Sequence, residues 1–168
     1  PTESPGYFET PLRRKQLEEA QQQGDSIVLD HTDTTKKTER KLGTVGAVAM
    51  DVNGNIAAAT STGGLTNKAY NRVGDTPIVG AGVYADNNTI AMSGTGIGEH
   101  FMLSVIGRYM ADVKEMTDTP TKDIAQAGID RFVSSVEGFG GVIVVDAHGG
   151  YSSAFSTPKL IHGLTTHE

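Results

Sequence analysis

Cysteine is absent from the 168 residues of this sequence, and aromatic residues make up only 6% of it. The absence of cysteine excludes disulfides, thiolate metal ligands and a cysteine nucleophile. It also means that cysteine usage gives no information on the redox compartment of the protein. No apolar run approaches the ~20 residues that a membrane-spanning helix needs. The first residues also lack the basic and apolar regions of a signal peptide. These absences predict a cytoplasmic protein without a membrane partner.

Positive charge is also scarce, with 14 Lys and Arg residues against 20 Asp and Glu residues and a formal net charge of -6. Such a surface repels polyanions, and no basic stripe suggests a groove for nucleic acid, so nucleic acid is not expected as a partner. Hydrophobic residues make up 37% of the chain, enough for one modest core in a single globular unit. The 21 glycines favour tight turns and close backbone approaches.

The first part of the chain predicts a helix, a short strand and a linker. Thr10 and Pro11 suit an N-cap followed by proline at the first helical position, and strong helix formers continue until Gly24 can cap the end. Residues 26–29 suit a short strand. Residues 30–41 are polar and aperiodic, and we interpret them as a mobile linker.

Three strand pairs are expected further on. The strongest signal is Asn53-Gly54 between residues 44–51 and 55–61, because this dipeptide suits a tight hairpin turn. The small residues of these two strands predict burial on both faces. The other two pairs are expected at residues 79–85 with 89–93 and 141–146 with 151–156.

Helical spacing separates the second strand pair from the third. One helix is expected to carry five residues on a shared face: Phe101, Val105, Ile106, Tyr109 and Val113. Another helix begins at Thr119-Pro120. After the first helix, the order is therefore four strands, two helices and two strands. Hairpins segregated from helices predict an α+β fold, with antiparallel sheets and helices packed on a face.

Nucleotide and metal sites find little support. The stretch Gly94–Gly98 follows a strand and opens a helix, but Glu99 stands at the third glycine of the dinucleotide pattern, where it would repel a pyrophosphate. What remains is a run of backbone N–H groups that could hold an anion or an oxyanion. The five histidines are dispersed without zinc-type spacing, so no metal ligands are expected.

A threonine is the remaining candidate nucleophile, because no serine lies in a G-x-S-x-G elbow. A threonine at a chain's N-terminus carries its own base, the free α-amine. Cleavage of the Gly43-Thr44 peptide would give Thr44 both groups at the start of a strand, and the linker would let the severed end move away. The spacing alone also fits an ordinary strand start.

Three stretches decide between these alternatives by resemblance: "GTVGAVAMDVNGNIAAATSTGGLTNK", "RVGDTPIVGAGVYADN" and "SGTGIGEH". Together they resemble the plant-type asparaginase and isoaspartyl peptidase family of N-terminal-nucleophile hydrolases. The resemblance implies part of a four-layer αββα sandwich. It makes residues 1–43 the end of an α-chain with its linker and residues 44–168 the β-chain. It also implies an α-chain partner and a dimer of αβ units.

The resemblance implies that members of this family are longer proteins, with a sodium-binding loop in their N-terminal half. The present sequence does not include that half, so no cofactor or metal is expected on it. The resemblance makes Thr44 the nucleophile released by self-cleavage after Gly43, and Thr62 the threonine that hydrogen-bonds and positions it. Gly63-Gly64 favours the plant-type branch over the glycosylasparaginases.

The substrate-binding residues also follow from the resemblance. Arg72 and Asp75 correspond to the pair that holds the α-carboxylate and α-amine of an aspartyl substrate, as a guanidinium fork and a carboxylate could. On spacing alone, an exposed loop ion pair fits them as well. Thr95 and Gly96 correspond to the oxyanion-hole donors, and Gly98 keeps their loop close.

Two departures from the family pattern concern loops. Asn71 stands where the family generally has glycine, and Ile97 stands where a polar residue is common. Neither removes a catalytic group. The expected reaction is hydrolysis of L-asparagine or of β-aspartyl dipeptides through an acyl-enzyme. The alternatives are an inert, uncleaved fragment that binds an amino acid or acts as a scaffold, a threonine aspartase and a glycosylasparaginase-like amidohydrolase.

Overall fold

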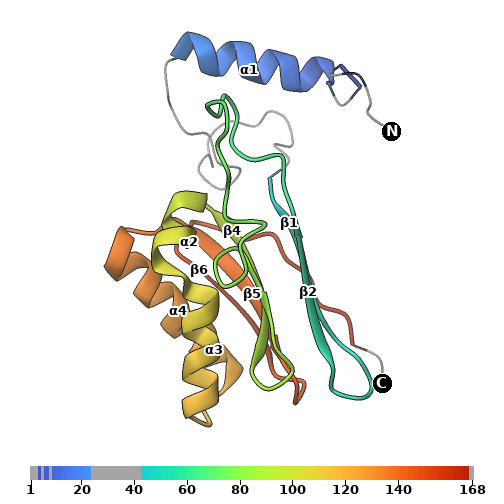
Figure 1. The fold of residues 1–168 in the computed structure, drawn as a ribbon, viewed down its shortest axis with the longest axis vertical. Coiled ribbons are helices and arrows are strands. Elements are labelled where there is room, and N and C mark those ends of the chain that lie inside the picture. Colours follow the sequence, from blue (N-terminus) through green and yellow to red (C-terminus); the bar gives the residue numbers. More distant parts are fainter. Residues whose placement is uncertain (1–3, 5, 8, 24–42, 167–168) are drawn as a thin grey trace.

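The described part of the chain contains two antiparallel sheets and four helices. Figure 1 shows how they are arranged. The computed structural model describes residues 4, 6–7, 9–23 and 43–166. The expected cap at Gly24, the strand at 26–29 and the linker at 30–41 lie outside these residues. Within them, no helix is long and apolar enough to cross a membrane. The helices and the antiparallel pairing of all strands confirm the expected α+β class.

The first helix has the N-terminal cap expected from its sequence. Helix α1 spans Pro11–Gln23. The side-chain oxygen of Thr10 accepts a hydrogen bond of 3.3 Å from the backbone N–H of Arg13, which satisfies one of the first-turn donors. Local chemistry thus sets where this helix begins.

Strands β1 (Val45–Met50) and β2 (Ile56–Ser61) form the expected hairpin, in which Val45 faces Ser61 and Met50 faces Ile56. In its turn, the carboxylate of Asp51 accepts backbone hydrogen bonds of 2.8 Å from Asn53 and Asn55. Gly54 takes the positive φ angle, 81°, that the turn needs. This short two-stranded unit carries the candidate nucleophile at its start.

The expectation that both faces of this hairpin are buried is wrong. Most of β1 is exposed, and Val45 keeps 70% of its surface accessible. One face lies very close to the second sheet, because a Cβ on Gly46 would sit 2.1 Å from the Ser93 hydroxyl oxygen. Among the described residues, little covers the opposite face. The small residues of this hairpin therefore allow one of its faces to pack closely on the second sheet, and they are not buried on both faces.

The second sheet has four strands in the order β3-β4-β5-β6, all antiparallel. They span Val83–Ala85, Ile90–Gly96, Gly140–Asp146 and Tyr151–Phe155. The third expected hairpin is confirmed as β5-β6. In the second pair, the first strand is shorter than expected, because Gly80 has a φ of +90° and donates a turn hydrogen bond of 2.8 Å to the Val83 carbonyl.

Three helices follow β4, where two were expected: α2 (Gly98–Ser104), α3 (Ile106–Met116) and α4 (Thr121–Val136). The expected single helix is interrupted at Val105, which takes a φ of 47°. Such an angle is unusual for a β-branched residue. The break buries both Phe101 and Ile106 while leaving Val105 partly exposed. Packing on the sheet therefore overrides the helical periodicity.

Strand alternation places the helices and the hairpin on opposite faces of the four-stranded sheet. Ile90, Met92 and Val144 join the core cluster that contains helix residues such as Phe101. Their strand neighbours Ala91 and Val145 instead join the cluster with Ile56 of β2. Because adjacent strand residues point to opposite faces, the sheet is covered on both sides. Figure 1 shows α2–α4 on one side and β1–β2 on the other.

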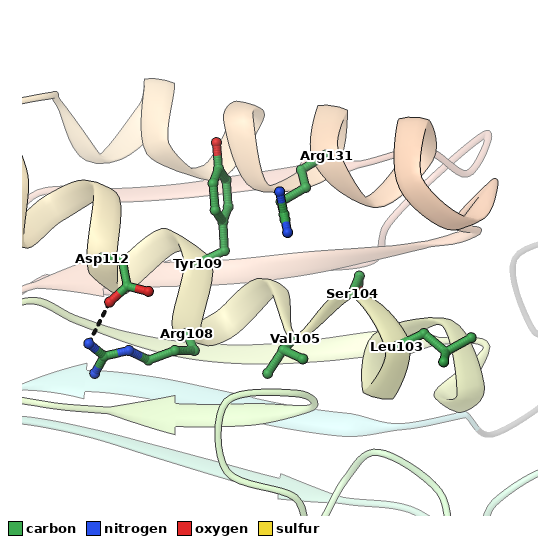
Figure 2. A pocket seen from close by; sticks show the side chains of 7 residues that line it. All are labelled: Leu103, Ser104, Val105, Arg108, Tyr109, Asp112 and Arg131. Atoms are coloured by element: carbon green, nitrogen blue, oxygen red, sulfur yellow. Dashed lines mark ion pairs between the residues drawn. The ribbon is translucent and has the colours of Figure 1, made fainter.

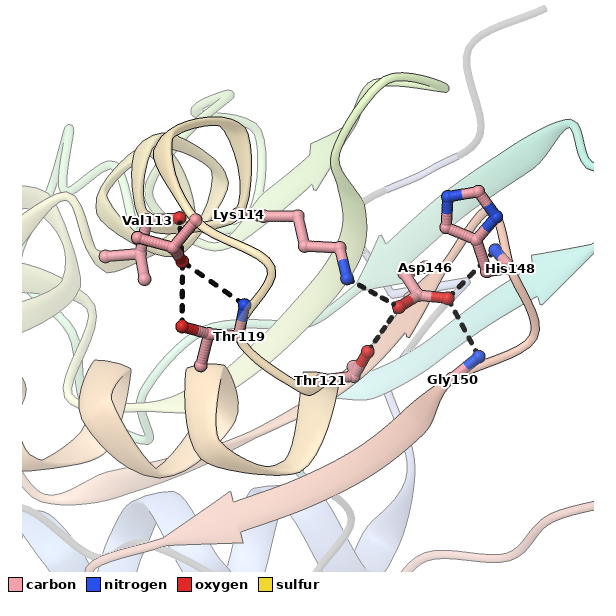
Figure 3. Close-up of polar contacts among 8 residues, drawn as sticks. Val113, Lys114, Thr119, Thr121, Asp146, His148 and Gly150 are labelled. Carbon is pink, nitrogen blue, oxygen red and sulfur yellow. Dashed lines mark hydrogen bonds and ion pairs between the residues drawn. The ribbon is translucent and has the colours of Figure 1, made fainter.

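A buried carboxylate joins the end of β5 to the helices α3 and α4 (Figure 3). Asp146, at the end of β5, accepts hydrogen bonds from the Thr121 hydroxyl at 2.5 Å and the Lys114 ammonium at 3.0 Å. Its other oxygen accepts the backbone N–H groups of His148 and Gly150 at 2.9 and 2.8 Å. Burial opposes the charge, but these bonds outweigh it and lower the pKa of Asp146 to about 2.

Candidate active site

The candidate nucleophile lies beside the threonine expected to position it. Thr44 immediately precedes β1, and Thr62 immediately follows β2, so the antiparallel pairing of these strands brings the two together. Their hydroxyl oxygens are 3.4 Å apart, with Thr44 as donor. The Thr62 oxygen also accepts the backbone N–H of Gly64 at 3.1 Å. Thr62 is thus held in place by the loop that follows it.

The same loop leads to the candidate substrate arginine. Gly64 takes a φ of +79°, and a Cβ built on it would lie 3.6 Å from Nη1 of Arg72. The Lys68 ammonium donates to the carbonyl of Gly63 and closes the loop. Thr62 and Arg72 therefore both lie beside Gly64.

Arg72 is engaged by a residue that the sequence reasoning did not assign to it. Its Nε and Nη2 groups donate to the two carboxylate oxygens of Glu99 at 2.7 and 2.8 Å. The hydrogen bonds from Arg72 lower the pKa of Glu99, and the bond to Glu99 raises the pKa of Arg72. Only 13% of the Arg72 side chain is exposed, against 46% for Glu99. No sequence pattern joins these positions, which lie 27 residues apart.

Asp75 presents a buried carboxylate at the same place. Only 7% of the residue is exposed, and its Oδ2 has no hydrogen-bond partner among the described residues. Burial raises the pKa of Asp75, although the nearby Arg72 opposes this effect. The unpartnered Oδ2 lies against Gly82, where a Cβ would sit 2.6 Å from it, whereas Oδ1 is the oxygen that faces Gly98.

Gly98 lies between the two candidate substrate-binding side chains. A Cβ at this position would be 2.8 Å from Oδ1 of Asp75 and 3.1 Å from Nη2 of Arg72. The carboxylate and the guanidinium therefore both approach one point in space. The structure brings Arg72, Asp75 and Gly98 together, and a side chain at position 98 would displace the other two.

Thr95 and Gly96 lie at the end of β4, paired with Gly141 and Gly140 of β5. Gly96 has a φ of 153°, and a Cβ there would sit 2.4 Å from the Phe139 carbonyl oxygen, so glycine is required. The expected run of backbone N–H groups is partly used within the fold, because Gly94 donates to the Gly82 carbonyl at 2.9 Å and Ile97 donates to the Phe139 carbonyl at 3.2 Å. This strand end leads directly into Gly98.

The departure at position 71 has a conformational explanation. Asn71 takes a φ of 63°, in the left-handed region. Glycine enters this region freely, and asparagine is among the few other residues enriched there. The loop before Arg72 therefore keeps a conformation that glycine would favour.

A surface hollow on the helices lies away from the candidate site. It is bounded by residues of α2, α3, α4 and the break at Val105, and none of the predicted site residues lines it (Figure 2). Arg108 pairs with Asp112 at its edge, and the Arg131 guanidinium lies 4.7 Å from the centre of the Tyr109 ring. Among the described residues, no group of three His, Asp or Glu side chains could hold a metal ion.

Comparisons with known proteins agree on one family. A family model described as asparaginase matches residues 1–168. The chain is 42% identical to the isoaspartyl peptidase of Escherichia coli strain K12 over 157 residues, which cover 94% of this chain and 49% of that protein. It is 50% identical to the isoaspartyl peptidase/L-asparaginase of Xenopus laevis over 119 residues, 71% of this chain and 38% of that protein.

A third relative extends the comparison. Identity to the isoaspartyl peptidase/L-asparaginase of Bos taurus is 38% over 151 residues, 90% of this chain and 46% of that protein. The chain thus spans about half the length of the curated relatives it matches. Since the family model covers all its residues, the chain belongs to this asparaginase family.

Proposed function

We propose that this chain supplies the nucleophile-bearing part of a threonine hydrolase that activates itself by cleavage and then hydrolyses L-asparagine, β-aspartyl dipeptides or both. The proposal rests on one observation: the hydroxyl oxygens of Thr44 and Thr62 lie 3.4 Å apart, and Thr44 directly follows Gly43 in the chain. Relatives named isoaspartyl peptidase or isoaspartyl peptidase/L-asparaginase support the substrate class.

Activation begins within the chain. The Thr44 hydroxyl attacks the carbonyl carbon of Gly43, which moves the acyl group from nitrogen to oxygen. The C–N bond breaks in this shift, which frees the α-amine of Thr44. Water then hydrolyses the ester, which frees the hydroxyl and leaves a carboxylate on Gly43. The freed amine is the base that an internal threonine lacks. Thr62, held by the N–H of Gly64, orients the hydroxyl.

Turnover uses the same hydroxyl. The α-amine takes its proton as the oxygen attacks the side-chain carbonyl of the substrate, and the proton then passes to the leaving nitrogen. Ammonia or an amino acid departs, and water hydrolyses the resulting ester to release aspartate. Thr95 and Gly96 act as the oxyanion donors, while Gly98 keeps their loop close.

Substrate orientation falls to the charged pair. The Arg72 guanidinium binds the α-carboxylate, and the Asp75 carboxylate binds the α-ammonium. The support is their approach to a single point beside Gly98. The site would then recognise the α-carboxylate and the α-ammonium of the substrate at the same time.

The arrangement of chains is also part of the proposal. An α-chain supplies the layer that completes a four-layer αββα sandwich, and αβ units pair as dimers. The exposed outer face of β1 supports such a partner, since Val45, Ala47 and Ala49, which alternate with the inward-facing Gly46, are all exposed. Covering this face would bury apolar surface beside the nucleophile.

Three substrates assayed side by side test the function. We expect the mature protein to release aspartate from L-asparagine, a β-aspartyl dipeptide or both, and to leave an aspartate-containing peptide intact. Cleavage of that peptide alone would instead identify a threonine aspartase. Absence of any turnover in a protein that remains uncut would favour the inert, scaffolding alternative.

A further inference from the structure

Lys68 is a cation beside the candidate site that the proposed mechanism does not use. It is exposed on the loop between β2 and Arg72, and its ammonium donates to the carbonyl of Gly63. None of the ion pairs among the described residues includes Lys68. An ammonium has three donors, so two of them are available to a ligand.

The Lys68 ammonium and the Arg72 guanidinium approach the same point. A Cβ built on Gly64 would lie 3.1 Å from Nζ of Lys68 and 3.6 Å from Nη1 of Arg72. The two nitrogens are therefore less than about 7 Å apart, a span that one carboxylate can bridge when it accepts from each at about 2.8 Å. Lys68 is thus close enough to share a carboxylate with Arg72.

The nitrogen of Arg72 that approaches Gly64 is the one that its ion pair does not use. Glu99 accepts from Nε and Nη2 and not from Nη1. Two neighbours of Nη1 are glycines, since a Cβ on Gly64 or Gly74 would lie 3.6 or 3.4 Å from it. The missing side chains leave room for a carboxylate beside Nη1, where Lys68 also lies.

The charges at the site favour a second cation. Glu99 and Asp75 contribute two carboxylates, whereas Arg72 contributes one cation. An α-carboxylate on Arg72 would share the guanidinium with Glu99, and the repulsion between these two anions would weaken its binding. The substrate ammonium balances Asp75 in the proposed mechanism. Lys68 supplies the further positive charge that the α-carboxylate needs.

We propose that Lys68 is a second substrate-binding cation, which shares the α-carboxylate of the aspartyl substrate with Nη1 of Arg72. The proposal rests on the proposed function and adds a determinant of its specificity. The α-carboxylate is not a reacting group, so its contacts are the same before and during the reaction. Lys68 therefore contributes to substrate affinity and leaves the chemical step unchanged.

Titration calorimetry on the mature protein, expressed from its whole reading frame, tests the proposal. The probes are L-aspartate and isoasparagine, in which an amide replaces the α-carboxylate. Lys68→Gln removes the charge but keeps a donor for the Gly63 carbonyl. We expect it to bind L-aspartate roughly fivefold more weakly, as for one exposed charge-assisted hydrogen bond, and to bind isoasparagine unchanged. With L-asparagine as substrate, KM should rise by a similar factor while kcat stays within about twofold.

Two further variants separate the charge from the loop. Lys68→Arg keeps a cation and should bind L-aspartate within about threefold of wild type. Lys122→Gln removes an exposed lysine from the first turn of α4 and should change the affinity for neither ligand. High salt should narrow the difference between wild type and Lys68→Gln, because it screens an exposed charge. Thermal unfolding verifies that each variant is folded.

The outcomes are distinguishable. If wild type binds L-aspartate and Lys68→Gln binds it equally well, the role of Lys68 is wrong and the proposed function stands. An equal loss for both ligands, a lower kcat with an unchanged KM, or a Lys68→Gln protein that stays uncut would each assign Lys68 to the loop that holds Thr62 and overturn the proposal. Wild-type protein that neither binds L-aspartate nor turns over substrate contradicts the proposed function itself.

Discussion

The hydroxyl oxygens of Thr44 and Thr62 lie 3.4 Å apart although 18 positions separate these residues in the chain. The antiparallel register of β1 and β2 produces this contact, because the first pair, Val45 and Ser61, lies directly beside them. A hairpin turn more than five residues away thus sets the geometry at the candidate nucleophile.

Replacing Thr62 tests whether this contact matters for turnover. We expect Thr62→Val to lower kcat roughly 100-fold, because a nucleophile displaced by about 1 Å loses about that much rate. Thr62→Ser keeps the hydroxyl and should stay within about tenfold of wild type. Steady-state kinetics on the cleaved protein provide the measurement. Full activity of Thr62→Val would remove Thr62 from the mechanism.

Asp75 should link substrate binding to pH. Burial raises its pKa above the ordinary value of 3.8, so the carboxylate is lost at a higher pH than for an exposed aspartate. We expect kcat/KM to fall as pH falls through this raised pKa. In Asp75→Asn, kcat/KM should drop on the order of 100-fold, because the ammonium loses its partner. A profile unchanged by the substitution would contradict this role.

The same substitution should make the protein more stable. The folded protein holds the Asp75 proton more tightly than the unfolded chain, so the free energy of unfolding falls as pH rises from 3.8 through the raised folded pKa. At pH 7 the buried charge is therefore a cost, which Asp75→Asn removes. Thermal unfolding at pH 7 should show a higher Tm, and a lower Tm would indicate that the carboxylate stabilises the fold.

Several features were predictable because they depend on neighbouring residues. The Thr10 cap and the Asn53-Gly54 hairpin follow from side chains within a few positions, and both are confirmed. The approach of Arg72 to Asp75 was also expected, although only through resemblance to a family. The catalytic roles of these residues remain predictions.

Other features depend on contacts between distant segments. The break at Val105 arises because α2 and α3 must both pack on the sheet, which helical periodicity does not record. Glu99 was interpreted only as an obstacle to a phosphate, since its bonds to Arg72 join a loop to a helix 27 positions away. An acidic residue directly after a glycine-rich loop was the one available signal.

Asp146 should stabilise the fold in a pH-dependent manner. Its folded pKa of about 2 lies below the ordinary 3.8, so its contribution, about 2 kcal/mol, is present above pH ~4 and lost as pH falls toward 2. Asp146→Asn should reduce the free energy of unfolding at pH 7 and matter little near pH 2. Urea denaturation at both pH values measures this. The exposed Asp118→Asn is the control, and an equal effect at both pH values would contradict the assignment.

The central claim is that Thr44 becomes a chain terminus. Mass spectrometry of the purified, active protein, expressed from its whole reading frame, tests it directly. We predict a β-chain that begins at Thr44, and in Thr44→Ala an uncut chain without turnover. Active protein that stays continuous across residues 43 and 44 would contradict the account, because its nucleophile would have no adjacent amine.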